Sequence, residues 1–236
     1  MKTTLTLLAA LTLTAAVAAD DLGQLLFQDD FARNESQEKT DDPGNGWGTN
    51  SKSRAKGNKQ VDLREGAMYI YLSPEANHAV SVTHAAEFTN GAVSLRFMLE
   101  DEKDSLGLDF ADVGCKEVHA GHLFAARISP KQVTLQDLKT GGMRLDIHDA
   151  RQAKKKLTEE QAQALKGKQK IVPLATEVGK WHELVVKISG EELSATIDGK
   201  DAGSFSSPGI AHPTKMMLRL AVPRNAVVDD VKIWKK

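Results

Sequence analysis

Apolar and polar residues alternate along most of this chain, and this period of two constrains the fold more than any other feature. In the range 93–99, apolar Val, Leu, Phe and Leu alternate with Ser, Arg and Met. A strand with one buried face produces such a pattern, whereas an amphipathic helix repeats every 3.6 residues. The same alternation marks further short segments at 68–72, 79–83, 106–110, 122–128, 133–137, 184–188, 193–197, 216–222 and 227–234. The sequence therefore predicts a chain built almost entirely of strands.

Turn residues between these segments indicate how the strands are connected. Asp198-Gly199 follows the segment 193–197, and Asp-Gly is a strong hairpin signal because both residues tolerate positive φ. Ser189 to Glu192 forms a second short connection, between 184–188 and 193–197. Short connections favour antiparallel neighbours over alternating strands and helices. We therefore expect an all-β, two-sheet antiparallel β-sandwich.

One segment departs from the strand pattern. Thr158 and Gln161 have the spacing of a capping box, and Gly167 stands where a helix would stop. The sequence thus predicts one short inserted helix near 158–167, of about two turns, from Glu159 to Lys166. The surrounding range 151–170 carries seven bases and two acids. It is interpreted either as a solvated insertion or as a patch for acidic polymers.

The first 19 residues have the features of a secretory signal. Lys2 is followed by an apolar stretch over 5–17, and small residues at Ala16, Ala18 and Ala19 suit cleavage before Asp20. The stretch is shorter than the roughly 20 apolar residues of a spanning helix, so no membrane span is expected. The sequence predicts a signal peptide over 1–19 and an exported protein, periplasmic or extracellular.

Composition and charge exclude several classes of protein. Lys and Arg number 31 against 32 Asp and Glu, a net charge of −1, which is unsuited to nucleic-acid binding through phosphate contacts. The hydrophobic share of 41% excludes a disordered chain. A single cysteine, Cys115, excludes an intrachain disulfide, so the core alone must hold the fold.

Three stretches together resemble one bacterial family. They are Leu26-Phe27 with Gly46-Trp47 and Arg64-Glu65-Gly66, the run 181–187 leading through Gly190 to Ile197-Asp198-Gly199, and the closing run 228–234. This order resembles the 3-keto-disaccharide hydrolase-type domains, which belong to the concanavalin-like jelly rolls together with laminin-G modules and family-16 glycoside hydrolases. The resemblance implies a curved sandwich whose concave sheet binds sugar. Separately from the resemblance, an acidic stretch over 20–42 followed by a basic one over 51–60 predicts an irregular N-terminal arm with the first strand over 20–60. No break in composition marks a second domain, so we expect the rest of a single jelly-roll domain over 61–236.

The chain departs from the family-16 hydrolases at their catalytic motif. Those enzymes carry an acid pair on an E-x-D-x-x-E strand, whereas the nearest run here is Glu100-Asp101-Glu102-Lys103-Asp104. The order of residues differs, and the run follows a strand at a turn. We interpret it as a solvated turn, because charge clusters are common at such positions.

The range 106–127 holds the greatest concentration of chemically active residues. Leu106, Leu108 and Phe110 face the core, so Asp109 projects from the opposite face of the same strand. Cys115, His119 and His122 follow at a spacing that could ligate Zn²⁺ or Cu, with Asp109 or Asp112 completing the set. This interpretation predicts a divalent metal, whereas the alternative is that the histidines form only local hydrogen bonds.

A second interpretation of the same region needs no metal. Asp109 and His122 would act as a general acid and base, and Arg127 would hold a substrate hydroxyl or oxyanion. Arg96 and Arg219 also point away from their core faces and could line the same cleft, binding substrate. Asp146 and His148 form an alternative pair if their segment is a strand. Ordinary Arg–Asp ion pairs would explain each of these residues singly.

Aromatic residues make up only 5% of the chain, too few for a long stacking strip. Trp47, in a Gly-Trp-Gly loop, is the tryptophan we expect to contact a sugar, whereas Trp181 and Trp234 are expected to pack in the fold. Together with the resemblance, these residues lead us to expect an exported carbohydrate-processing protein. Its candidate activity is hydrolysis of glycosidic bonds in (3-keto-)disaccharides. The alternatives are a non-catalytic carbohydrate-binding module and an envelope interaction domain.

Overall fold

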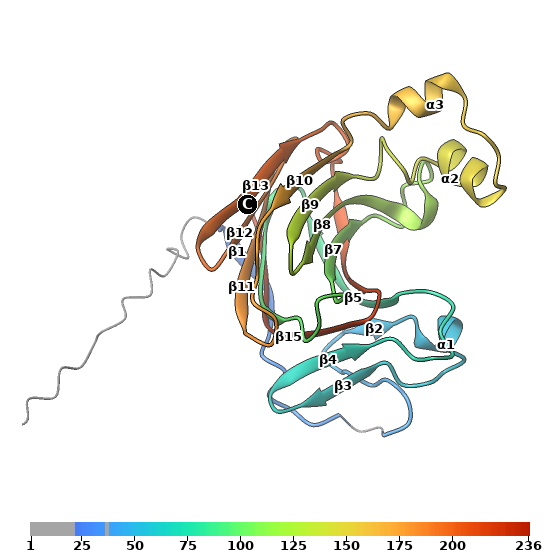
Figure 1. The fold of residues 1–236 in the computed structure, drawn as a ribbon. Helices are drawn as coiled ribbons and strands as arrows, with labels where there is room; N and C mark the ends of the chain where they lie inside the picture. Colours follow the sequence, from blue (N-terminus) through green and yellow to red (C-terminus); the bar gives the residue numbers. More distant parts are fainter. Residues whose placement is uncertain (1–21, 36–37) are drawn as a thin grey trace, which may run out of the picture.

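The computed structural model describes residues 22–35 and 38–236, so the predicted signal peptide over 1–19 lies outside the described residues. Two antiparallel sheets pack face to face (Figure 1), which confirms the predicted β-sandwich. Sheet A has the order β13-β12-β11-β6-β15-β4-β3, and β1 also pairs with β15. Its strands are β1 (Gln24–Asp29), β3 (Val61–Arg64), β4 (Ala67–Tyr71), β6 (Gly91–Met98), β11 (His182–Ser189), β12 (Glu192–Ile197), β13 (Lys200–Ser206) and β15 (Asn225–Lys235).

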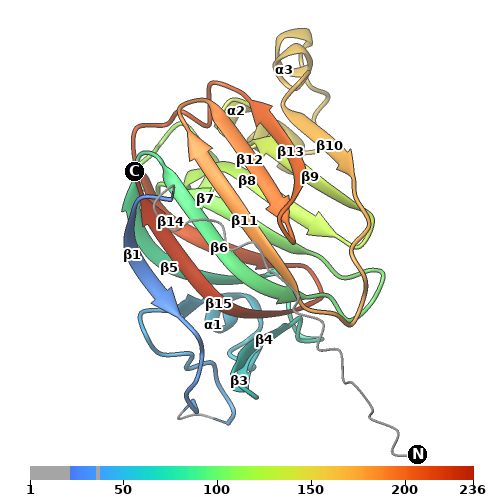
Figure 2. The ribbon, with the colours of Figure 1, turned by 90° about the vertical axis from the view of Figure 1, so that its left-hand side faces the viewer.

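Sheet B has the order β10-β9-β8-β7-β14-β5-β2. Its strands are β2 (Gly48–Thr49), β5 (Val80–Phe88), β7 (Leu106–Ala111), β8 (His122–Ser129), β9 (Gln132–Asp137), β10 (Gln169–Pro173) and β14 (Lys215–Val222). The face of sheet B turned away from sheet A is concave (Figure 1), and Figure 2 shows sheet A lying in front of sheet B. We refer to this surface as the concave face.

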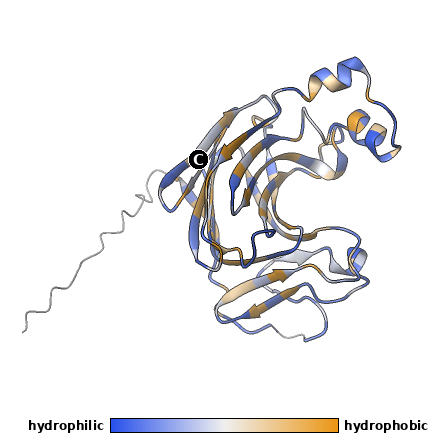
Figure 3. Ribbon diagram, in the orientation of Figure 1, coloured by the Kyte–Doolittle hydropathy of each residue, from blue (hydrophilic) through white to orange (hydrophobic). Residues whose placement is uncertain are grey.

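The core lies between the two sheets and is built by the alternation seen in the sequence. Phe97 of β6, Phe110 of β7 and Phe124 of β8 are fully buried, and the last two rings stack with centroids 4.8 Å apart. Hydropathy changes along each strand as successive residues turn inward and outward (Figure 3). Each large apolar side chain removed from water contributes about 1.5–3 kcal/mol. In a chain with one cysteine, this burial must hold the sandwich together.

The predicted turn and helix signals are confirmed. Asp198 and Gly199, with φ of 52° and 72°, form the two-residue connection between β12 and β13. The predicted inserted helix is α3 (Glu159–Ala164), which ends two residues before the expected end. Its capping box is complete, because the Gln161 amide donates to Thr158 Oγ1 and the Thr158 amide donates to Gln161 Oε1.

The described residues contain three further helical segments that the periodicity did not indicate. They are α1 (Ser51–Arg54), the 3₁₀ turn η2 (His119–Gly121) and α2 (Leu145–Gln152). The helices α2 and α3 together connect β9 to β10, so they stand beside one edge of sheet B (Figure 1). Within the described ranges, none of the helices has the length and apolar character needed to cross a membrane.

Candidate functional site

Neighbouring strands of sheet B align polar side chains in one row across the concave face. Asp109 on β7 lies opposite Arg219 on β14 and Ala125 on β8, and Ala125 in turn lies opposite Gln136 on β9. The core-facing residues on either side of Asp109 are buried leucine and phenylalanine. Because successive residues of a strand face opposite sides, Asp109 is directed to the concave face. The alternation of apolar and polar residues in the sequence predicts this side of the strand for the Asp109 carboxylate.

Asp109 and His122 form a close pair at the centre of this row. Nδ1 of His122 lies 2.7 Å from Oδ2 of Asp109. An ionised carboxylate only accepts hydrogen bonds, so Nδ1 carries the proton of the neutral imidazole and Nε2 carries the lone pair. The Asp109 side chain is almost fully buried, whereas His122 is half-buried. The pair therefore combines a fixed carboxylate with a histidine that a ligand can reach.

Arg219 completes the group and is held in place by the backbone. Its Nη2 atom donates to the carbonyl oxygen of Ala120 at 2.7 Å, and Nη1 lies 3.8 Å from Oδ1 of Asp109. Nη1 also lies 3.4 Å from both ring nitrogens of His122, so the guanidinium rests against the imidazole ring. Oδ1 of Asp109 is buried and makes no hydrogen bond within the described structure. The neighbouring guanidinium of Arg219 balances its charge.

Arg127 begins a chain of hydrogen bonds that extends the polar row toward the helical insertion. Nε of Arg127 donates to Oε1 of Gln136 at 2.9 Å, and Nε2 of Gln136 donates to Oε1 of Gln169 at 2.8 Å. These residues lie on β8, β9 and β10. Because the bond to Gln136 uses Nε, it fixes the guanidinium plane while the two terminal nitrogens stay available.

Small residues under these long side chains let them lie along the sheet. Gly107 on β7 lies between Arg127 on β8 and Ala221 on β14. A Cβ atom at Gly107 would meet Cγ of Arg127 at 3.6 Å and Cβ of Ala221 at 3.4 Å. An alanine would therefore fit here in ordinary contact, whereas a larger side chain would crowd the aliphatic stem of Arg127.

Solved structures share this architecture. The laminarinase from Rhodothermus marinus matches with a TM-score of 0.58 and 13% identity over 90% of this chain and 97% of that chain. SCLam, a non-specific endo-β-1,3(4)-glucanase from family GH16, matches with a TM-score of 0.55 and 14% identity over 89% and 90%. The carbohydrate-binding module CBM66 from Bacillus subtilis matches with a TM-score of 0.51 and 12% identity over 84% and 97%. The fold is that of the concanavalin-like jelly rolls.

No protein-family model and no curated protein sequence matches the chain. The jelly roll is therefore shown by the shape of the backbone and not by similarity of sequence.

The predicted turn at 100–104 lies between β6 and β7, as expected. One of its acids is not solvated, however, because Asp104 is 1% exposed and accepts from the Asp101 amide at 2.9 Å.

The prediction that Arg96 lines the same cleft as Arg219 is wrong. Arg96 lies on β6 of sheet A, so its side chain points to the outer surface of the other sheet. There its Nη1 pairs with Oδ2 of Asp229 at 3.0 Å, and its guanidinium lies 4.8 Å from the ring centroid of Trp181. Alternation shows which residues leave the core but does not show on which sheet they do so.

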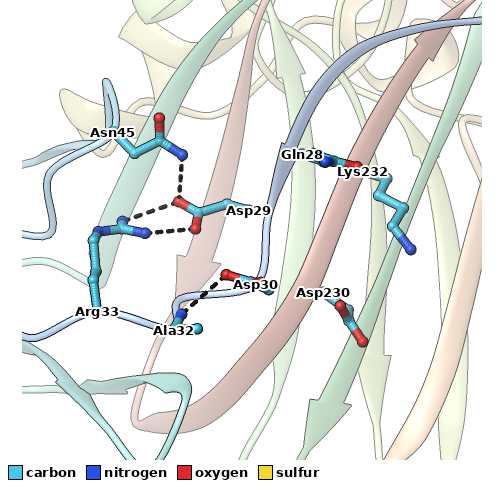
Figure 4. Close-up of a pocket in the computed structure, with 8 residues that line it drawn as sticks. All are labelled: Gln28, Asp29, Asp30, Ala32, Arg33, Asn45, Asp230 and Lys232. Atoms are coloured by element: carbon cyan, nitrogen blue, oxygen red, sulfur yellow. Dashed lines mark hydrogen bonds and ion pairs between the residues drawn. The ribbon is translucent and has the colours of Figure 1, made fainter.

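The predicted ligand contact of Trp47 is also wrong. Trp47 is 7% exposed and packs in the core against Phe27 and Phe31. Its Nε1 donates to Oδ2 of Asp29 at 2.9 Å, and Arg33 and Asn45 converge on the same carboxylate (Figure 4). The cavity drawn there, of about 470 Å³, opens beside β1 and β15 of sheet A and not on the concave face.

The residues predicted to hold a metal are not brought together as a ligand set. Cys115 packs against the hydrophobic core, and His119 stacks on His148 with ring centroids 3.7 Å apart. Asp112 is paired instead with Nε2 of His212 at 3.0 Å, and this hydrogen bond lowers the pKa of the carboxyl. Over residues 22–35 and 38–236, no three His, Cys, Asp or Glu side chains have an arrangement suited to a metal ion. The donors present therefore do not fit the predicted metal.

Asp146 and His148 do not share one face, because their segment is the helix α2 and not a strand. Residues two apart on a helix point in different directions. Asp146 binds Arg144 through two hydrogen bonds, which hold the pKa of its carboxyl well below the ordinary value. Leu145 and Ile147, an apolar pair two apart, mimic the strand period over this short segment.

Proposed function

We propose that the concave face of sheet B is a carbohydrate-processing site in which His122 acts as a general base. The observation that carries this proposal is the hydrogen bond between His122 Nδ1 and Asp109 Oδ2, 2.7 Å long. It leaves the lone pair on Nε2 and stabilises the imidazolium that forms after proton transfer. The fold supports a carbohydrate ligand, because its structural neighbours include laminarinases and a carbohydrate-binding module. The predicted signal peptide supports a site that works outside the cytoplasm.

The composition of β7 argues against a mechanism that uses two carboxylates. Such glycosidases place two acids about 5–5.5 Å or 6.5–9.5 Å apart across the scissile bond. The residues of β7 on the concave face are Gly107, Asp109 and Ala111, which supply one carboxylate. That carboxylate is committed to His122. The chemistry available here is proton abstraction by one base beside the guanidinium group of Arg219.

A 3-keto-disaccharide is a substrate that such a base can cleave. The ketone acidifies the proton on C2, and His122 Nε2 would take that proton. The electron pair of the C2–H bond forms a C1–C2 double bond, the C1–O bond to the second sugar breaks, and the leaving oxygen gains a proton. Water then adds across the double bond, so that the net reaction is hydrolysis. Arg219 would stabilise negative charge developing on the C3 oxygen. Arg127 is bonded to Gln136, two strands from Asp109, and would hold the neighbouring sugar instead.

The experiment that tests this proposal compares a 3-keto-disaccharide with the same disaccharide carrying an unoxidised C3 hydroxyl. We expect the wild-type protein to release sugar only from the 3-keto compound, and His122→Gln to lower the rate about 10²–10⁴-fold. His78→Gln is the matched control, because this exposed histidine bonds only the Ala79 carbonyl oxygen in the described structure. Equal rates for the wild type and His122→Gln would contradict the proposal.

Non-catalytic carbohydrate binding is the second candidate, and the similarity to CBM66 favours it. In that case the arginines and His122 would hold sugar hydroxyls without proton transfer. Calorimetric titration with oligosaccharides would then show binding in both the wild type and His122→Gln, with no product from either substrate.

A further inference from the structure

We propose that a cavity between the strands β8–β10 and the α2–α3 insertion binds an acidic group, a carboxylate or a sulfate ester, carried by the carbohydrate that the concave face takes. This inference rests on the proposed function and names the class of its substrate. The cavity has a volume of about 530 Å³. Its polar lining is supplied chiefly by Arg127, Gln136, Arg151, Lys168 and Gln169.

The cavity gathers positive charge from separate parts of the chain. Arg127 comes from β8, Arg151 from the last turn of α2, and Lys168 from the segment just before β10. Two of these cations belong to the basic range 151–170. The remaining lysines of that range, at 154–156, 166 and 170, are exposed and do not line the cavity. Lining the cavity therefore distinguishes Arg151 and Lys168 from the other cations of the range.

The one acidic residue in the lining does not neutralise this charge at the cavity surface. Asp137 is 1% exposed, and its carboxylate is saturated by hydrogen bonds from Thr140, Ser207 and Gly209. Lys168 Nζ lies 3.7 Å from Asp137 Oδ2, a long ion pair. Asp137 therefore anchors the loops behind the cavity, and its negative charge does not offset the positive charges of Arg127 and Arg151.

Both arginines have donors to offer an anion. In the described structure, Arg127 forms one hydrogen bond, through Nε to Gln136, and no ion pair. Arg151 packs close to Gly142, where an added Cβ would lie 3.2 Å from Nη1, and no carboxylate pairs with it among the described residues. A guanidinium with its terminal nitrogens free binds a carboxylate or sulfate through two parallel hydrogen bonds.

The cavity and the Asp109–His122 pair lie on neighbouring strands of sheet B. Gln136 lies two strands from Asp109 in the same cross-strand row. Neighbouring strands are about 4.8 Å apart, so the two positions are separated by about 10 Å. One carbohydrate chain can therefore place one ring over His122 and an acidic neighbouring ring against Arg127, Arg151 and Lys168.

The test measures binding, so that its outcome is independent of turnover. Calorimetry in low salt would use three probes of equal length: an oligogalacturonate for carboxylates, a carrageenan oligosaccharide for sulfate esters, and a neutral laminarin oligosaccharide. The protein is the His122→Gln variant, which prevents consumption of any probe. We expect at least one acidic probe to bind about tenfold or more tightly than the neutral probe, because charge-assisted hydrogen bonds are the stronger ones.

The decisive comparison keeps the change in net charge constant. Arg151→Gln/Lys168→Gln removes two cavity cations, whereas Lys154→Gln/Lys155→Gln removes two exposed cations of the same insertion. We expect a loss of about tenfold or more in affinity for the acidic probe in the first variant and less than about twofold in the second. Three results would each overturn the inference. They are equal losses of affinity in the two double variants, equal affinity for the acidic and the neutral probes, and no binding of either acidic probe.

Failure of this inference and failure of the proposed function give different results. If the cavity does not bind acidic sugars, the cavity variant binds the acidic probe no more weakly than its control, yet His122→Gln still lowers the rate of cleavage of a neutral 3-keto-disaccharide about 10²–10⁴-fold. If the proposed mechanism fails, His122→Gln keeps its activity whatever the cavity variants show. Comparing the carboxylate and sulfate probes then identifies which acid the cavity accepts.

Discussion

Nδ1 of His122 lies 2.7 Å from Oδ2 of Asp109, and the two residues approach each other from adjacent strands of the concave face. The carboxylate is nearly buried, so it cannot turn toward solvent without losing this bond. The orientation of the imidazole is therefore fixed before a ligand arrives. The proposed proton abstraction depends on this preorganised ring.

Replacing the carboxylate tests its orienting role. Asp109→Asn keeps the shape of the side chain, but its amide can donate to Nδ1 and favour the tautomer with the proton on Nε2. We expect kcat on a 3-keto-disaccharide to fall about 10²–10⁴-fold while KM changes little. Steady-state kinetics measures this split. A rise in KM with unchanged kcat would show that Asp109 serves binding instead.

The room over Gly107 gives a second prediction. Ala at this position adds a Cβ in ordinary contact with Arg127 and Ala221, whereas the branched methyls of Val would push the Arg127 side chain off the sheet. Gly107→Val should lower kcat/KM about 10²-fold, and Gly107→Ala much less. The Tm of both variants should stay close to that of the wild type, because Val suits a strand. Equal kinetics for Ala and Val would contradict the packing described.

Trp47 and Trp181 should behave in opposite ways. Trp47→Ala removes a buried ring and leaves Asp29 without one donor, so unfolding free energy should fall by about 3–5 kcal/mol. Trp181 is 36% exposed, and Trp181→Ala should cost clearly less. Urea denaturation of the two variants measures the difference. Similar losses would mean that Trp47 is not the core residue that the structure shows.

A pH-dependent contribution to stability is expected at His119. Burial, and then the neighbouring rings of His148 and His122, lowers the pKa of His119. The unfolded chain therefore binds this proton more readily, and the folded state loses stability as pH falls below about 6.5, the ordinary histidine value. Urea denaturation at pH 7.5 and 5.5 should show a smaller pH dependence in His119→Gln than in the wild type. An equal pH dependence of stability in the wild type and in His119→Gln would contradict this prediction.

The alternation of apolar residues was sufficient to predict the architecture and part of the site. Asp109 and Arg219 could be placed on the side of their strands away from the core because their neighbours are leucines and phenylalanine. Their pairing depends on β7 and β14 being adjacent in sheet B, although more than 100 residues separate the strands. No local pattern encodes that adjacency.

The incorrect predictions have the same origin. Arg96 satisfies the same rule as Arg219 but lies on β6, in the other sheet. Trp47 looked exposed in a glycine-rich loop, and only the three-dimensional position of Asp29 shows why its indole turns inward. Gln136 and Gln169 were missed because amides are common on solvated strands. Their outward positions on β9 and β10 were the available signal.

The central claim is that His122 removes a proton from a carbohydrate bound on the concave face, and hydrogen exchange at C2 tests it most directly. A 3-keto-disaccharide is incubated with the protein in D₂O, and NMR follows deuterium at C2 of the remaining substrate and of the product. We expect deuterium at C2 of the product with the wild type and with His78→Gln, and a loss of turnover with His122→Gln. Two results would contradict the claim. One is product that retains protium at C2 and is released at the wild-type rate, and the other is product released at that rate by His122→Gln.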